Sequence, residues 1–164
     1  MERDARRHPV VNGFAEAWSA PTLEGFLNLF TTDVRLRAPF TEPSTGHDEA
    51  YQEFARLLYV WPDVTGVVDR WSAAGDTAFI EWRLQGPFSG RNLSFRVVDR
   101  ILTRDGLIAE REMFGDGLTI ATPFLRSPSH WLRTWRSGLA PMRWMRRVMR
   151  LTSSRRRFTR ETQT

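Results

Sequence analysis

Two charged residues, Asp99 and Arg111, stand where the strand pattern turns side chains toward the protein interior. Asp99 shares one face of its predicted strand with Phe95, Val97 and Ile101, because successive strand residues point to opposite faces. A carboxylate in such a row is costly to bury unless a partner or a raised pKa relieves it. Asp99 is therefore the first candidate for chemistry, and its alternative role is a purely structural pairing with an arginine or the backbone.

Arg111 is the second candidate. In the next predicted strand it lies on the same face as Met113, which is expected to point toward the interior. Facing inward, it would pair with Asp99 or hold a ligand's carboxylate or carbonyl group. Facing outward, it would lie among Glu110 and Glu112, and Asp99 would then be a neutral hydrogen-bond donor with a raised pKa. We favour the inward placement and take Asp99 and Arg111 as the candidate catalytic residues.

A hairpin positions these two residues on neighbouring strands. The two apolar-alternating runs meet at Arg104-Asp105-Gly106, and Asp-Gly readily adopts the positive φ angles of a tight turn. The strands on either side are therefore expected to pair antiparallel.

The rest of the body is predicted to be helices followed by strands. Helical spacing places Phe14 and Trp18 on one face of the first helix, Phe26 and Phe30 on the second, and Tyr51 and Phe54 on the third. A strand over 33–38 precedes the third helix, and strands over 64–72 and 77–84 follow it. This order predicts an α+β fold in which a curved antiparallel sheet wraps around three N-terminal helices, with a pocket between the layers.

The charge divides the chain in two. All 24 basic residues are arginine, and 11 of them lie in residues 124–164 together with one acidic residue. That segment therefore has a net charge of +10, residues 1–123 have a net charge of −5, and the whole chain has +5. We predict a domain over 1–123 and a basic amphipathic helical extension with a disordered end over 124–164. With its tryptophans and arginines, the extension could cover the protein's own pocket, pack against the second subunit of a homodimer or bind an anionic membrane surface. Nucleic-acid binding is disfavoured.

Several classes of chemistry are disfavoured by composition. The chain has no cysteine, its three histidines have no metal-ligand spacing, and no phosphate-binding or dinucleotide motif is present. We expect neither a metal nor a cofactor. The charged amino terminus has no apolar segment behind it, so a cytoplasmic location is expected.

The order of elements resembles the SnoaL-like group of the NTF2-like superfamily. The resemblance is carried by Leu29-Phe30-x-x-Asp33-Val34, by the loop ending in Gly46, by Asp105-Gly106-Leu107-Ile108 and by Phe114-Gly115-Asp116. It covers about residues 8 to 136 and implies a cone-shaped fold that hosts isomerases, cyclases, dehydratases, epoxide hydrolases and proteins without chemistry.

Residue sets of two branches are only partly matched. By resemblance to ketosteroid isomerases, the general base falls on Ala38, two tyrosines fall on Phe14 and Phe54, and the second oxyanion-hole carboxyl falls on Asp99. Dienolate isomerisation requires a base, which alanine cannot supply. The limonene-epoxide-hydrolase set is missing as well, because its last-strand aspartate falls on Met113.

The sequence thus predicts a SnoaL-like protein that binds a small hydrophobic molecule of polyketide, steroid or terpenoid type. The resemblance implies an isomerase, cyclase or dehydratase (lyase), and the missing bases leave open a noncatalytic binding or interaction module. The expected apolar pocket is lined by Phe14, Trp18, Leu36, Phe54, Trp82, Phe95, Val97 and Met113.

Overall fold

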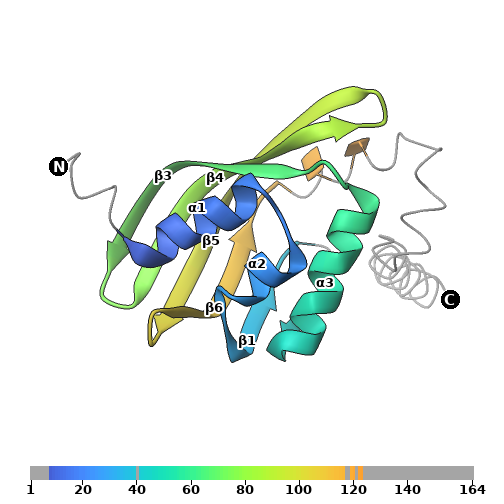
Figure 1. Cartoon of the computed structure of the whole chain (residues 1–164). Coiled ribbons are helices and arrows are strands. Elements are labelled where there is room, and N and C mark those ends of the chain that lie inside the picture. The colour runs from blue at the N-terminus through green and yellow to red at the C-terminus, as the bar shows by residue number, and fades with distance from the viewer. Residues whose placement is uncertain (1–7, 40, 117–118, 121, 124–164) are drawn as a thin grey trace, which may run out of the picture.

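The computed structural model describes residues 8–39, 41–116, 119–120 and 122–123, and the predicted basic extension lies outside them. Figure 1 shows the helices on one side of a curved sheet, so the α+β prediction is confirmed. No helix in the described ranges is long and apolar enough to cross a membrane. The elements in chain order are α1 (Pro9–Ser19), α2 (Leu23–Leu27), β1 (Phe30–Arg37), β2 (Ser44–Thr45), α3 (Gly46–Val60), β3 (Thr65–Ala74), β4 (Thr77–Phe88), β5 (Arg91–Arg104) and β6 (Leu107–Phe114).

The sheet has the strand order β2-β1-β6-β5-β4-β3. Strands β3 to β6 form an antiparallel meander, as their sequential turns predict. Strand β1 pairs with β6 in parallel, with Leu36 opposite Arg111. The first strand of the chain therefore lies beside the last, which closes α1, α2 and α3 over the concave face.

The turn between β5 and β6 has the expected geometry. Asp105 and Gly106 have φ angles of 54° and 78°, the left-handed values that a two-residue hairpin turn requires. The preceding hairpin is longer than the sequence suggests, because β4 continues past residue 84, where the predicted strand ends, as far as Phe88. Phe88 is buried against Trp61, which explains why the strand extends this far.

The strand alternation matches the observed burial. In β4 the buried residues include Ala78, Ile80 and Trp82, whereas Phe79 between them is 46% exposed. In β5 the inward row contains Asp99, which has no exposed surface. The phase predicted for both central strands is therefore confirmed.

Two helix predictions are wrong in detail. The second helix ends at Leu27, and Phe30 instead begins β1, although its side chain is still buried. Tyr51, expected to face inward from α3, is 42% exposed, while Phe54 on the same helix is buried. Thr22 caps the start of α2, because its hydroxyl accepts a hydrogen bond of 3.0 Å from the Gly25 amide.

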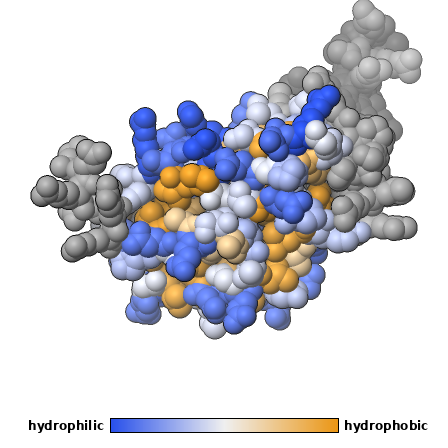
Figure 2. Space-filling model, turned by 45° about the horizontal axis from the view of Figure 1, so that its top comes forward, coloured by the Kyte–Doolittle hydropathy of each residue, from blue (hydrophilic) through white to orange (hydrophobic). Residues whose placement is uncertain are grey.

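The sheet face away from the helices carries both charged and apolar side chains. Among the described residues, four ion pairs join neighbouring strands of the sheet, including Arg96–Glu81 and Arg100–Glu112, and a fifth joins Arg104 of β5 to Asp33 of β1. Figure 2, turned by 45° from the view of Figure 1, shows that apolar side chains also reach the surface between hydrophilic ones on the face that it displays. Exposed apolar side chains on the outward parity of β3 to β6 are Val67, Phe79, Leu102 and Phe114.

Gly66 in β3 allows two indole rings to approach the sheet. A Cβ atom at this position would lie 2.7 Å from Cβ of Trp18 and 2.8 Å from the ring of Trp82. Both distances are shorter than real carbon contacts, so no side chain fits without moving α1 or β4. A glycine inside a strand often marks such an approach.

We expect Gly66→Ala to lower the free energy of unfolding by about 1–3 kcal/mol, the usual cost of overpacking a core. Ser72→Ala, an exposed position of the same strand, is the control and should change it by less than about 0.5 kcal/mol. Urea denaturation measures both. Equal stability of the two variants would show that Trp18 and Trp82 can move aside for a Cβ atom at position 66, and would contradict the close packing described here.

Candidate functional site

The interior of the fold contains an ion pair between Asp99 and Arg111. The Nε atom of Arg111 donates a hydrogen bond of 2.5 Å to Oδ2 of Asp99. The side chain of Asp99 is 0% exposed and that of Arg111 is 7% exposed, so solvent screens the pair little. The structure therefore places Arg111 inward, beside the carboxylate.

The register of the strands explains this meeting. Asp99 of β5 lies opposite Met113 of β6, and Arg111 lies opposite Ile101. Asp99 and Arg111 are thus diagonal neighbours on the same face of an antiparallel pair, a separation that a long side chain spans. The turn at Asp105 pairs Arg104 with Leu107, and a one-residue register shift between Leu102 and Thr103 then places Arg111 opposite Ile101.

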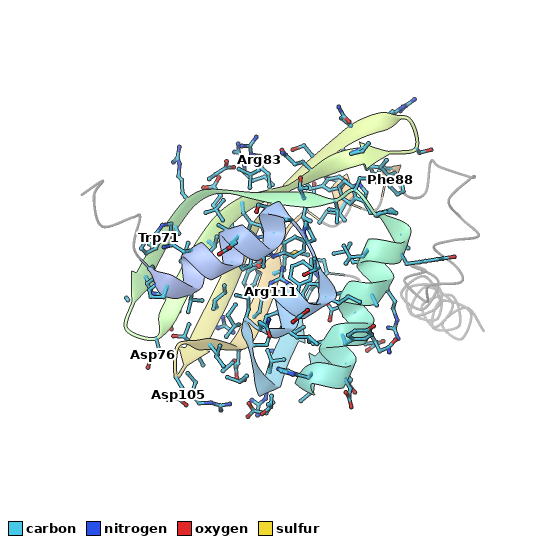
Figure 3. All side chains as sticks on the ribbon, in the orientation of Figure 1. Trp71, Asp76, Arg83, Phe88, Asp105 and Arg111 are labelled. Atoms are coloured by element: carbon cyan, nitrogen blue, oxygen red, sulfur yellow. The ribbon has the colours of Figure 1, made fainter. Side chains whose placement is uncertain are left out.

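Four aromatic rings surround the guanidinium of Arg111. Its Cζ atom lies 5.7 Å from the ring centre of Phe14, 5.5 Å from Trp18, 5.9 Å from Phe54 and 5.7 Å from Trp82. The rings come from α1, α3 and β4, and Figure 3 shows Arg111 at the centre of the molecule between these elements. A cation over an aromatic face is stabilised by up to about 2 kcal/mol when water is excluded.

The electrostatics of the pair are set mainly by burial. Loss of water raises the pKa of Asp99 above its ordinary value of 3.8, and the charge of Arg111 opposes the rise. The N–H of Trp82 also lowers this pKa, although its geometry is not that of a hydrogen bond.

Two polar atoms of this interior have no partner. Oδ1 of Asp99 accepts no hydrogen bond, and Nε1 of Trp82 donates none, although both atoms are buried. Buried polar groups in native proteins are nearly always paired, so each unpaired one requires an explanation. A ligand or a water molecule that contacts both would provide it.

The structure places the predicted lining residues in one core cluster, and the rings of four of them surround Arg111. Trp18 packs against Trp82 with ring centres 4.5 Å apart, and Phe14 meets Trp82 edge to face at 5.1 Å. Met113 is only half-buried, and it contacts the core cluster from β6. The fully buried members of the predicted set are Phe14, Trp18, Leu36, Phe54, Trp82, Phe95 and Val97.

Other candidates lie elsewhere or have structural roles. Arg83 points to the opposite face of the sheet, where it binds Asp69 in a bidentate pair, and Figure 3 shows it away from Arg111. Asp116 accepts a hydrogen bond of 2.6 Å from the hydroxyl of Thr119 just after β6. In the described part of the chain, no three His, Asp or Glu side chains are grouped to hold a metal ion.

Sequence reasoning missed two features of the site. It treated Trp82 only as an apolar wall and gave no sign that its N–H would be unpaired. It also gave Gly66 no role, although a glycine next to inward-facing apolar positions was a usable signal.

The profile of the SnoaL-like domain matches residues 11–111, more than half of the chain. The protein belongs to the SnoaL-like family. No curated protein matches the sequence. The family assignment agrees with the resemblance seen in the sequence and with the curved sheet around helices.

Solved structures share the NTF2-like cone fold of this SnoaL-like protein. A protein with a ketosteroid isomerase-like fold from Catenulispora acidiphila, in complex with trimethylamine, has a TM-score of 0.61 at 18% identity, and the match covers 69% of this chain and 89% of that protein's chain. A candidate SnoaL-like polyketide cyclase from Jannaschia sp. CCS1 has 0.63 at 20%, covering 73% and 94%. TerC, co-crystallised with polyporic acid, has 0.61 at 18%, covering 71% and 97%.

A double-mutant cycle tests the energetics of the pair. Arg111→Met should lower the free energy of unfolding by about 3–5 kcal/mol, because it leaves the carboxylate of Asp99 buried without a partner. Arg111→Met combined with Asp99→Leu should recover most of this loss, since apolar replacements of a buried pair are often neutral. Arg96→Met is the control for an exposed pair and should cost less than about 1 kcal/mol. No recovery in the double variant would contradict this account.

The pH dependence follows from the raised pKa of Asp99. The folded state holds this proton at a higher pH than the unfolded state, so the carboxyl's contribution to stability falls as pH rises from about 3.8 through the folded pKa. In Arg111→Met the pKa should rise further, and the stability gap to the unaltered protein should widen with pH. Carbon-detected NMR of the carboxyl and urea midpoints at several pH values measure this; a gap that narrows with rising pH would refute it.

Proposed function

We propose that this protein binds a small hydrophobic molecule inside its cone, with Asp99 and Arg111 as the polar contacts. The observation that carries the proposal is the unpaired Oδ1 of Asp99, a buried acceptor within an aromatic interior. Apolar walls with a few convergent polar groups are typical of small-molecule sites. The predicted lining residues, from Phe14 to Met113, would supply the apolar contacts.

The comparisons support a ligand of this general kind. One neighbour is in complex with trimethylamine, and another was co-crystallised with polyporic acid. For this chain we propose a polyketide, steroid or terpenoid-like molecule, with an isomerase, cyclase or dehydratase as the enzyme class if the bound molecule is converted.

Binding without chemistry is the second candidate function, and one observation favours it. Among the described buried residues, Asp99 and Arg111 are the charged ones, and arginine keeps its proton at all physiological pH values. The position that matches the general base of ketosteroid isomerases is Ala38, which follows β1 and is only half-buried. Proton transfer of this kind requires two positioned groups. Among the described buried charged residues, Asp99 is the one that could give or take a proton.

We further propose that the protein acts as a cytoplasmic homodimer. The uncovered sheet face supports this idea, because Phe79 and Phe114 are 46% and 49% exposed there. The extension over 124–164 would act as a unit separate from the domain over 1–123, either against a second subunit or on an anionic membrane.

Binding can be tested with propiophenone, a neutral aromatic ketone, by ligand-observed NMR. The unaltered protein should bind it, and Arg111→Met should weaken binding about tenfold, because the carboxylate of Asp99 then has no counter-ion and repels the carbonyl oxygen of the ligand. Arg96→Met, on the outer face, should bind as the unaltered protein does. Circular dichroism at the same temperature would verify that each variant is folded. Equal affinity of all three proteins would contradict the proposed site.

A further inference from the structure

Three polar side chains form a diagonal row across the concave face of the sheet. Asp99 of β5 lies between Trp82 of β4, which is opposite Val97, and Arg111 of β6, which is opposite Ile101. All three face the helices and are 0%, 0% and 6% exposed in that order. They therefore bound a single small region of the interior.

The hydrogen bonds within this row are incomplete in a specific way. Oδ2 of Asp99 accepts from Arg111 Nε, whereas Oδ1 has no donor. Nε1 of Trp82, in contrast, has no acceptor. The interior thus offers one free acceptor and one free donor on adjacent strands, and a ligand that satisfies both must carry a donor and an acceptor close together.

The charges of the row cancel. A guanidinium stays protonated, and the carboxylate at 2.5 Å balances it. An anionic ligand would approach the carboxylate of Asp99 and a cationic ligand the guanidinium of Arg111, each in a medium that screens repulsion poorly. A neutral ligand avoids both penalties.

We propose that the ligand is a neutral hydroxyketone, with its hydroxyl donating to Asp99 Oδ1 and its neighbouring carbonyl accepting from Trp82 Nε1. This inference rests on the proposed function and narrows it to a ligand class. Trp82 thereby becomes a specificity-determining residue, and Asp99 acts as an acceptor. The apolar remainder of the ligand packs against the rings of Phe14, Trp18 and Phe54.

A series of single-ring probes separates the two contacts. Phenacyl alcohol carries both oxygens, propiophenone lacks the hydroxyl, phenethyl alcohol lacks the carbonyl, and phenacyl methyl ether keeps the oxygen without its proton. Phenacyl alcohol should bind about tenfold more tightly than each of the other three, because each lacks one hydrogen bond. The anion phenylglyoxylate should bind more weakly than phenacyl alcohol. Ligand-observed NMR titration measures all five.

Two variants assign the contacts to residues. Trp82→Phe keeps a ring but removes the N–H, so phenacyl alcohol and phenethyl alcohol should bind this variant equally. Asp99→Asn can turn an amide donor toward the ligand, so the preference for the alcohol over its methyl ether should be lost. Trp61→Phe is the control, because the Trp61 N–H already donates to the Pro87 carbonyl at 3.0 Å and the probe ranking should not change.

The outcomes distinguish this inference from the function on which it rests. If propiophenone binds the unaltered protein as tightly as phenacyl alcohol does, the proposed apolar site stands and the hydroxyketone assignment is overturned. If phenylglyoxylate bound most tightly, the hydroxyketone assignment would also be overturned, because preference for an anion would show that the row of Trp82, Asp99 and Arg111 has a net positive charge. Failure of every probe to bind would overturn both proposals.

Discussion

The ion pair of Asp99 and Arg111 is the constraint on which the interior depends. A guanidinium is stable beneath the helices only because a carboxylate balances its charge at 2.5 Å and four aromatic rings turn toward it. Those rings come from α1, α3 and β4, so the pair connects both layers of the fold. Its geometry follows from the β5–β6 turn together with the one-residue register shift between Leu102 and Thr103.

Much of the fold could be predicted because its signals are local. Alternation along β4 and β5 gave the right phase for Trp82 and Asp99, and Asp105-Gly106 gave the right turn. The parallel pairing of β1 with β6 was not predicted, since it joins segments distant in the sequence. Phe30 was assigned to a helix because its spacing fits that period, whereas pairing with Ile108 makes it part of a strand.

The candidate site was predictable only in part, for a related reason. Parity indicated that Asp99 and Arg111 face inward, and therefore which charges meet. The ring cage around the guanidinium depends on how α1 and α3 cross the sheet, which no periodicity specifies. The unpaired N–H of Trp82 is likewise a property of packing, because its ring position is set by Trp18 and by the space above Gly66.

Arg111 also changes what the carboxyl of Asp99 can do. A carboxyl alone in an apolar interior gains a proton and becomes a hydrogen-bond donor, as the resemblance to ketosteroid isomerases would imply. With a permanent cation beside it, protonation would leave that cation buried and uncompensated, so the ionised form is retained at the expense of donor ability. The same aspartate on the same fold thus becomes an acceptor. Ala38 stands at the position that matches the general base of ketosteroid isomerases. The role that we propose for this interior is therefore to select a hydroxyl-bearing ligand, and not to move its protons.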